Sequence, residues 1–179
     1  FTLITGMFLH STNGINHIFW NMYGLMMFGT LLEQKIGPKR FLFIYLFSGL
    51  MASIGHIVIS NILFGSASPA LGASGAIMGM LGAMIILLPE VRLLFFFFIP
   101  MSLRTAGVVW ILMDIFGVFI PNGIGNVAHL AGMFTGLIYG LILNKQKKHY
   151  YKKFTKPQSI QAKHLDTNDF DEYIKSGRL

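Results

Sequence analysis

Apolar residues form five long runs along the chain, separated by short segments that contain proline, glycine or polar residues. Each run approaches the ~20 residues that a helix needs to cross the hydrocarbon core of a membrane. The prolines and the Gly37-Pro38 pair stand where they would break a helix or direct a turn. The pattern predicts an all-α polytopic membrane helix bundle with spans at Ile15–Leu32, Phe41–Phe64, Ser74–Leu88, Leu103–Ile120 and Asn126–Leu143.

Composition supports this prediction. Of the 179 residues, 54% are hydrophobic, 12% are charged and 17 are Phe, which is too apolar for an ordinary soluble domain of this size. Because the chain has no cysteine, disulfides, a thiolate nucleophile and a cysteine-based metal site are excluded. We expect a transmembrane domain over residues 1–143 and a basic tail over residues 144–179, which lies at the lipid interface up to Lys156 and is loosely ordered beyond it.

The positions of the charges predict the orientation in the membrane. With five spans, all 14 Lys and Arg residues fall on one side, and the loops 1–14, 65–73 and 121–125 on the other side contain none. By the positive-inside rule, the charged side and the C-terminal tail face the cytosol, as expected for a bacterial inner membrane. The net charge of +7 therefore indicates anionic membrane lipids as partners, and no nucleic acid.

Four polar side chains fall in one layer of the predicted bundle. Polar residues inside a span are costly, so each one calls for a role. A helix rises ~1.5 Å per residue, so the height of each residue above the charged side of the membrane can be counted along its span. The heights are about 21 Å for Asn21, about 22 Å for Ser74, about 24 Å for His129 and about 27 Å for His17. In a hydrocarbon core of ~30 Å this layer is recessed below the outer surface, and the short helix that begins at Ser74 leaves space above it for water.

These residue types suit acyl transfer. Unpaired N–H groups and the helix dipole at Ser74 can stabilise the oxyanion of a tetrahedral intermediate. His129, within hydrogen-bond reach, would accept the serine proton and pass it to the leaving amine. His17 and Asn21 are four residues apart, so they share a helix face and would add side-chain donors to the oxyanion hole.

Small residues predict how two of the helices meet. Glycines repeat at intervals of four residues, which lets membrane helices approach backbone to backbone. His129 lies three residues before Gly132 and therefore projects from the packing face, toward the helix that begins at Ser74. The predicted packing glycines are Gly75 and Gly79 on the third helix and Gly132 and Gly136 on the fifth.

Simpler interpretations of the same residues stay open. A serine in a membrane helix usually bonds to its own helix, a lone histidine is more often a structural hydrogen-bonding group, and repeated glycines show only that helices touch. A soluble esterase is disfavoured, because the nucleophile-elbow motif needs glycine where this chain has Ala76. The histidine spacings match no metal-binding signature, and we expect neither a metal nor a cofactor.

Three other ionisable residues have less defined roles. Asp114 is the candidate third member of a catalytic triad, but counting from Arg104 places it about 15 Å up, roughly 7 Å below the serine and the histidine, which favours a structural role. His56, in the middle of the second span, is expected to be a core histidine with satisfied hydrogen bonds. His10 belongs either to the outer loop or to the water cavity.

Together these residues resemble the rhomboid family of intramembrane serine proteases. The resemblance implies a Ser74–His129 dyad without a catalytic acid, and an oxyanion hole from His17, Asn21 and the Ser74 backbone N–H. It also implies that the fourth helix and the outer loop at 121–125 gate the lateral entry of a substrate helix. The resemblance covers nearly all of residues 1–143 and includes Gly72-Ala73-Ser74-Gly75, His17-Ile18-Phe19-Trp20-Asn21, Ala128-His129 followed by Gly132 and Gly136, and Leu32-Glu33 with Gly37 downstream.

The chain departs from the family pattern in three places. The family core has six helices, and the first is missing here; because the chain begins with Phe1, we expect a fragment with five of the six. His10 and His17 are seven residues apart, a wider gap than is usual in the family, and Met78 stands where the family often has an aromatic ring on the histidine. The basic segment Arg92–Pro100, with its four consecutive Phe, is expected at the membrane interface.

The resemblance implies an intramembrane serine endopeptidase. Its substrates would be single-span membrane proteins, cut near the outer end of their helix at small residues in a readily unwound stretch. One alternative is a catalytically inactive relative that binds membrane helices, although the retained Ser74 and His129 argue against it. Another is a small channel or transporter that uses the same wet cavity, but such a protein does not require a serine at a helix start.

Overall fold

The computed structural model describes residues 2–10, 15–68, 71–95, 98–120 and 125–154. The chain divides into two compact units, Phe1–Asn144 and Lys145–Leu179. The first unit holds every candidate site residue. In the second unit, the last helix continues to Phe154, and the part of the tail expected to be loosely ordered lies outside the described residues.

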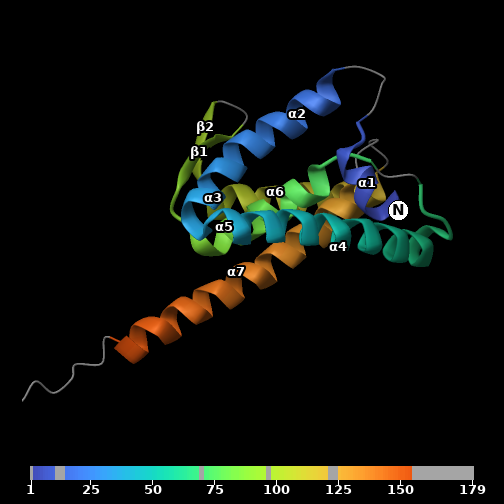
Figure 1. The fold of residues 1–179 in the computed structure, drawn as a ribbon. Helices are drawn as coiled ribbons and strands as arrows, with labels where there is room; N and C mark the ends of the chain where they lie inside the picture. Colours follow the sequence, from blue (N-terminus) through green and yellow to red (C-terminus); the bar gives the residue numbers. More distant parts are fainter. Residues whose placement is uncertain (1, 11–14, 69–70, 96–97, 121–124, 155–179) are drawn as a thin grey trace, which may run out of the picture. The chain divides into compact units, whose positions relative to one another are not determined.

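The first unit consists mainly of helices (Figure 1). Four of the five predicted spans match helices to within four residues at each end, whereas the last helix, Asn126–Phe154, extends eleven residues beyond the predicted end at Leu143. The elements are α1 (Thr2–Thr5), η1 (Gly6–Phe8), α2 (Asn16–Gly24), η2 (Leu25–Gly29), α3 (Thr30–Ile36), α4 (Pro38–Phe64), α5 (Ser74–Leu87), β1 (Arg92–Phe95), β2 (Ile99–Ser102), α6 (Leu103–Phe119) and α7 (Asn126–Phe154). The first predicted span is continuous from α2 to α3, and its middle turn, η2, is a π-helix that the apolar pattern did not predict.

Gly37 and Pro38 make the turn between α3 and α4. The N–H of Gly37 donates to the carbonyl of Glu33 at 2.7 Å, and the φ of Gly37 is +83°, which glycine adopts without steric cost. Pro38 then occupies the first turn of α4, where its missing N–H would have no intrahelical partner. The pair therefore ends one helix and begins the next without a connecting loop.

Helix α5 is the central element of the core. Residues 75–84 on this helix are all buried. A side chain at Gly79 would collide with Ser48 of α4 and would lie 3.1 Å from the carbonyl oxygen of Gly132 on α7. Helix α5 thus lies between α4 and α7, and its small residues set the close spacing of all three.

Strands β1 and β2 form an antiparallel hairpin between α5 and α6, with Arg92 opposite Ser102. The sequence predicts an interfacial segment and no strand here, because a run of Phe shows no alternation between polar and apolar positions. The N–H of Leu103 donates to the carbonyl of Val91 at 2.8 Å, which joins the hairpin to the start of α6. The all-α description is therefore corrected to a helical bundle with one small hairpin.

The number of spans stays a prediction. Among the described residues, two helices are long and apolar enough to cross a membrane, Pro38–Phe64 and Asn126–Gln146, and Ser74–Leu87 is a shorter apolar helix. Helix α6 has 17 residues, close to the lower limit of about 17 for a span. These lengths are compatible with five spans.

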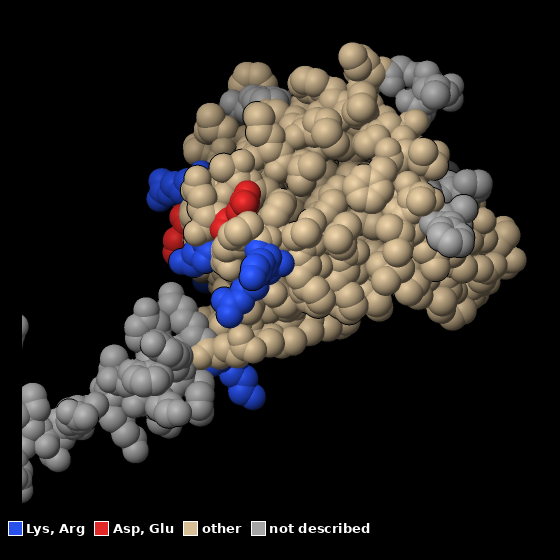
Figure 2. Space-filling model, in the orientation of Figure 1, with Lys and Arg blue, Asp and Glu red and all other residues tan. Residues whose placement is uncertain are grey.

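Charged side chains of the first unit gather at one end of the face that Figure 2 shows, and uncharged residues form the rest of that face. This is the end at which α3 meets α4 and at which the hairpin lies (Figure 1). There Arg104 and Glu90 form an exposed ion pair with a nitrogen–oxygen distance of 3.3 Å. An end that keeps its charges together can lie in the lipid headgroups while the uncharged remainder lies in hydrocarbon.

Candidate active site

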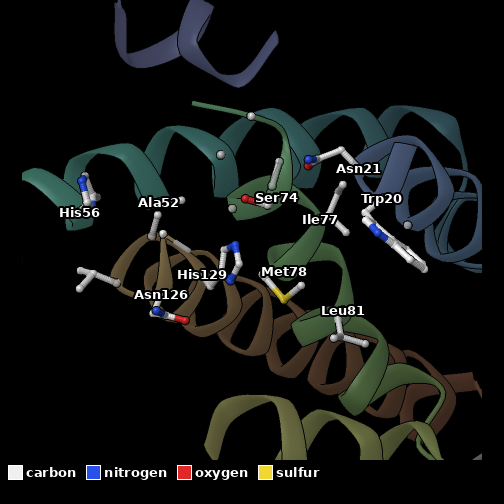
Figure 3. Close-up of a pocket in the computed structure, with 18 of the residues that line it drawn as sticks. Trp20, Asn21, Ala52, His56, Ser74, Ile77, Met78, Leu81, Asn126 and His129 are labelled. Carbon is white, nitrogen blue, oxygen red and sulfur yellow. The ribbon is translucent and has the colours of Figure 1, made fainter. Parts of the chain in front are cut away.

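A cavity of about 1250 Å³ opens in the first unit, and its lining is mostly apolar. Polar side chains from four helices also line it (Figure 3). They include all four residues that the sequence places at one depth. The polar lining residues include His17 and Asn21 from α2, His56 from α4, Ser74 from α5, and Asn126 and His129 from α7.

Ser74 is the first residue of α5 and is half-buried. The turn before it is made by Gly72, whose φ of +105° is disfavoured for any residue with a side chain. The N–H of Gly72 donates to the carbonyl of Gly6 at 2.9 Å, which fixes this turn to the N-terminal segment. Because the first N–H groups of a helix have no intrahelical acceptor, the Ser74 hydroxyl lies beside backbone donors.

His17 and Asn21 lie against the turn that leads into Ser74. A Cβ on Gly72 would be 2.6 Å from Cε1 of His17 and 3.7 Å from Nδ2 of Asn21. Nδ2 of Asn21 donates to the backbone carbonyl of His17 at 2.7 Å. An amide has two such N–H bonds, so one remains for another acceptor. The structure thus brings His17 and Asn21 next to the serine turn.

His129 lies in the first turn of α7 and is 7% exposed. Helix α7 reaches α5 through its glycines: a side chain on Gly132 would collide with the carbonyl oxygen of Gly75, and one on Gly136 with that of Gly79. The structure therefore brings the four glycines singled out in the sequence into two backbone contacts. These contacts hold the start of α5 beside the start of α7.

Ser74 and His129 line the same cavity (Figure 3). Within the part of the chain that the structure describes, no hydrogen bond joins the two side chains. Catalytic hydrogen bonds are often long in a free enzyme and shorten when substrate binds, so this geometry is compatible with a nucleophile and its base. The side-chain partner of His129 in the structure is a different residue.

That partner is Asp114. Nδ1 of His129 and Oδ1 of Asp114 are 3.1 Å apart, and the two side chains are 9% and 5% exposed. The depth estimate that placed Asp114 roughly 7 Å below Ser74 and about 9 Å below His129 is therefore wrong. Counted from the connection between α6 and α7, Asp114 lies five residues before the end of α6 and His129 three after the start of α7, so their depths differ by only ~3 Å. The similar depth of Asp114 and His129 could therefore have been predicted from the sequence by counting from this connection.

Two further histidines have defined surroundings. Nε2 of His56 lies 2.8 Å from the carbonyl oxygen of Ser68, and Oγ of Ser60 lies 3.5 Å from Nδ1 of His56, so His56 is a buried histidine with partners on both ring nitrogens. The ring of His10 lies 5.3 Å from that of His17. His10, in the loop after η1, therefore lies beside His17 of α2 but is not among the residues that line the cavity.

Other sequence expectations concern metals and gating. In the described ranges, no three His, Asp or Glu side chains are grouped so that they could hold a metal ion. The fourth predicted helix is α6, and most of the loop expected to gate the site, residues 121–124, lies outside the described residues. Met78 is 4% exposed and lines the same cavity as His129.

Comparison with known proteins identifies the family. The family model described as the Rhomboid domain matches residues 1–146. This chain belongs to the rhomboid family. The resemblance carried by the serine, histidine and asparagine motifs is thereby confirmed, and a rhomboid domain agrees with a helical membrane bundle of this kind.

Three relatives illustrate the breadth of the rhomboid family. The chain is 34% identical to rhomboid protease GluP of Bacillus subtilis over 84% of its own length and 27% of the relative's. It is 33% identical to RHOMBOID-like protein 6, mitochondrial, of Arabidopsis thaliana, over 90% and 49%. It is 35% identical to the human presenilin-associated rhomboid-like protein, mitochondrial, over 69% and 33%. The chain thus spans about half or less of the length of these rhomboid proteins.

The names of these relatives bear on the membrane in which this chain resides. A rhomboid domain is a membrane domain, so the membrane class is supported. The expected bacterial inner membrane is not, because relatives from Arabidopsis and from human are named as mitochondrial, whereas GluP is bacterial.

Proposed function

We propose that this rhomboid chain is an intramembrane serine endopeptidase in which Ser74 is the nucleophile and His129 the general base. The observation that carries the proposal is the backbone contact of Gly75 with Gly132. That contact places a helix-start serine and a buried histidine at one cavity. Attack of Oγ on a peptide carbonyl would transfer the serine proton to Nε2 of His129, which then protonates the leaving amine. Water, activated by the same nitrogen, would hydrolyse the acyl-enzyme.

The oxyanion of the tetrahedral intermediate would be stabilised by three groups. These are the backbone N–H of Ser74, the second N–H of the Asn21 amide and a ring N–H of His17. Their support is the position of His17 and Asn21 against Gly72, two residues before the nucleophile. Removal of one such donor typically lowers kcat by about 10²–10³. The reaction needs only water besides the peptide, so no cofactor is required.

The substrates would be single-span membrane proteins. A cavity with a mostly apolar lining inside an apolar helical domain accepts a segment that is already in the membrane more readily than a soluble chain. Cleavage near the outer end of the substrate helix, at small residues in an unwound stretch, would expose the scissile carbonyl to Ser74. We place the protease domain at residues 1–143 in five spans, with the tail 144–179 and the charged end on the cytosolic or matrix side, next to anionic lipids.

The test is cleavage in a membrane. The protein would be reconstituted in liposomes with tagged single-span substrates, as wild type, Ser74→Ala and His129→Ala. Both substitutions are expected to abolish cleavage, and a fluorophosphonate is expected to label the wild type but not Ser74→Ala. Ser60→Ala is a matched control, because Ser60 is a buried serine that lines the same cavity from α4.

Two results would contradict the proposal. One is cleavage that survives Ser74→Ala. The other is a folded wild type that neither cleaves any substrate nor reacts with the fluorophosphonate, which would favour a non-catalytic protein that binds membrane helices.

A further inference from the structure

We infer that the charged end of the first unit holds a specific site for an anionic phospholipid, in which Arg40 of α4 and Tyr139 of α7 bind the phosphate. The observation that carries the inference is the position of these residues on neighbouring helices. Phe43, one turn after Arg40, has its ring centroid 5.6 Å from that of Tyr139, and Arg40 is near enough to Tyr139 to interact with it electrostatically. The inference rests on the proposed placement of this end in the lipid headgroups and not on protease activity.

Arg40 is an exposed cation at the end where Figure 2 shows the charges together. Among the described residues it makes no ion pair, whereas Arg104 at the same end is paired with Glu90. A guanidinium binds a phosphate through two parallel hydrogen bonds. Basic residues between membrane helices on the cytoplasmic or matrix side are typical binding groups for anionic lipid headgroups. Arg40 can therefore take its anion from the membrane.

Tyr139 supplies a hydroxyl on the neighbouring helix. The residue is half-buried, and in the part of the chain that the structure describes its hydroxyl has no hydrogen-bond partner. A tyrosine hydroxyl donates a hydrogen bond to a phosphate oxygen, and tyrosine is enriched at the level of the lipid headgroups. Because Arg40 lies on α4 and Tyr139 on α7, one phosphate can be held between the two helices.

An aromatic strip on α4 continues from this cation. Arg40, Phe43 and Phe47 are separated by three and four residues, so they share one helix face. The rings of Phe43 and Phe47 are stacked with their centroids 5.3 Å apart, and the two residues are 50% and 42% exposed. Phe47 lies about 10 Å along the helix from Arg40. The strip can therefore contact an acyl chain of the lipid whose phosphate lies on Arg40, a contact that free phosphate cannot make.

The local charge selects the class of lipid. The segment from Glu33 to Arg40 contains three basic residues and one acidic residue, and the other two basic residues are Lys35 and Lys39. A lipid with a net negative charge is attracted to this segment. A zwitterionic lipid also carries a phosphate, but its cationic headgroup would be repelled by the same side chains. The site should therefore distinguish phosphatidylglycerol from phosphatidylcholine.

Native mass spectrometry of the detergent-solubilised protein tests the site. Dissociation constants of the first bound lipid would be measured for phosphatidylglycerol and phosphatidylcholine with the same acyl chains. The wild type is expected to bind phosphatidylglycerol more tightly, by about tenfold or more. Arg40→Gln is expected to weaken this binding about tenfold or more and to remove the preference, and Tyr139→Phe to weaken it several-fold. Lys35→Gln is the matched control, because Lys35 is an exposed cation at the same end, and loss of one charge from a general attraction should weaken binding by no more than about fivefold.

Three results would overturn the inference. The first is equal affinity of the wild type for the two lipids. The second is an equal loss of affinity in Arg40→Gln and Lys35→Gln, which would mean a general electrostatic attraction without a site. The third is displacement of the lipid by millimolar inorganic phosphate, which would assign the site to a free anion.

Two further measurements keep these results interpretable. Unfolding midpoints without lipid would show that each variant is folded. If Arg40→Gln is not, Arg40→Lys takes its place, because it keeps the charge, loses the planar fork and should weaken binding several-fold. Lipid binding is measured without a substrate. A protein without protease activity would therefore refute the proposed function and leave the test of the lipid site intact.

Discussion

The carbonyl oxygen of Gly75 occupies the space in which a side chain on Gly132 would begin. This contact joins the helix that starts with Ser74 to the helix that carries His129. Ser74 directly precedes Gly75, and His129 lies about one turn before Gly132. The distance between Ser74 and His129, the proposed nucleophile and base, is therefore determined by backbone packing and not by long side chains. We therefore expect small changes in this packing to change kcat for cleavage.

Gly132→Ala is expected to force α5 and α7 apart. Overpacking of this kind costs typically about 1–3 kcal/mol, and the displaced His129 should lower kcat by at least tenfold. Gly29→Ala is a matched control, because the nearest atoms to its new methyl group are side-chain carbons at 3.4 Å, an ordinary contact. Thermal unfolding in detergent and cleavage in liposomes would be measured for both. Normal cleavage by a folded Gly132→Ala variant would contradict the role of this contact.

Gly72→Ala is expected to disturb the oxyanion donors. The methyl group would meet the ring of His17 at 2.6 Å, and the φ of +105° would be strained. Gly65→Ala separates these effects, because Gly65 also has a positive φ, +73°, but no atom within 4 Å of the added group. Both variants should lose stability, by about 1–3 kcal/mol. Only Gly72→Ala should lose kcat per folded molecule, and equal kcat values for the two variants would argue against His17 as a donor.

Asn21→Ala tests the amide donor. Loss of one oxyanion-hole donor should lower kcat by about 10²–10³ with a smaller effect on KM. Asn61→Ala is the control: its Nδ2 makes the same bond to its own helix, to the carbonyl of Ile57 at 2.7 Å, but at an exposed position. Steady-state cleavage of one single-span substrate would compare them. If both substitutions lower kcat equally, the amide of Asn21 acts through helix stability and not on the oxyanion.

The helices were predictable because their ends carry strong local signals. The start of α4 follows from Gly37 and Pro38, and the start of α5 from the small residues around Gly72. The hairpin at Arg92–Phe95 was not predictable, because its strands are four residues long and consist largely of apolar residues without alternation. The π-helical turn in the first span was also missed, since an apolar run does not distinguish one helical hydrogen-bond pattern from another.

The candidate site was predictable in its members but not in all its contacts. The four residues that the sequence predicts at one depth all line one cavity. The depth predicted for Asp114 was wrong, because it assumed that Arg104 before α6 and Lys145 on α7 lie at the same height in the membrane. Side-chain contacts between neighbouring helices depend on tilt and offset, which periodicity within a single helix does not record.

His56→Ala distinguishes a structural histidine from a catalytic one. The substitution would leave the carbonyl of Ser68 without the bond that His56 now makes at 2.8 Å, and the lost hydrogen bonds and side-chain volume should lower the free energy of unfolding by about 1–3 kcal/mol. Because His56 contacts the loop and not the serine turn, kcat per folded molecule should stay within a few-fold of wild type, whereas His129→Ala should abolish it. Unfolding midpoints and active-site titration with a fluorophosphonate would separate stability from rate. A folded His56→Ala protein without activity would mean that this second buried histidine takes part in the reaction, and the assignment of His129 as the base would then have to be tested against it.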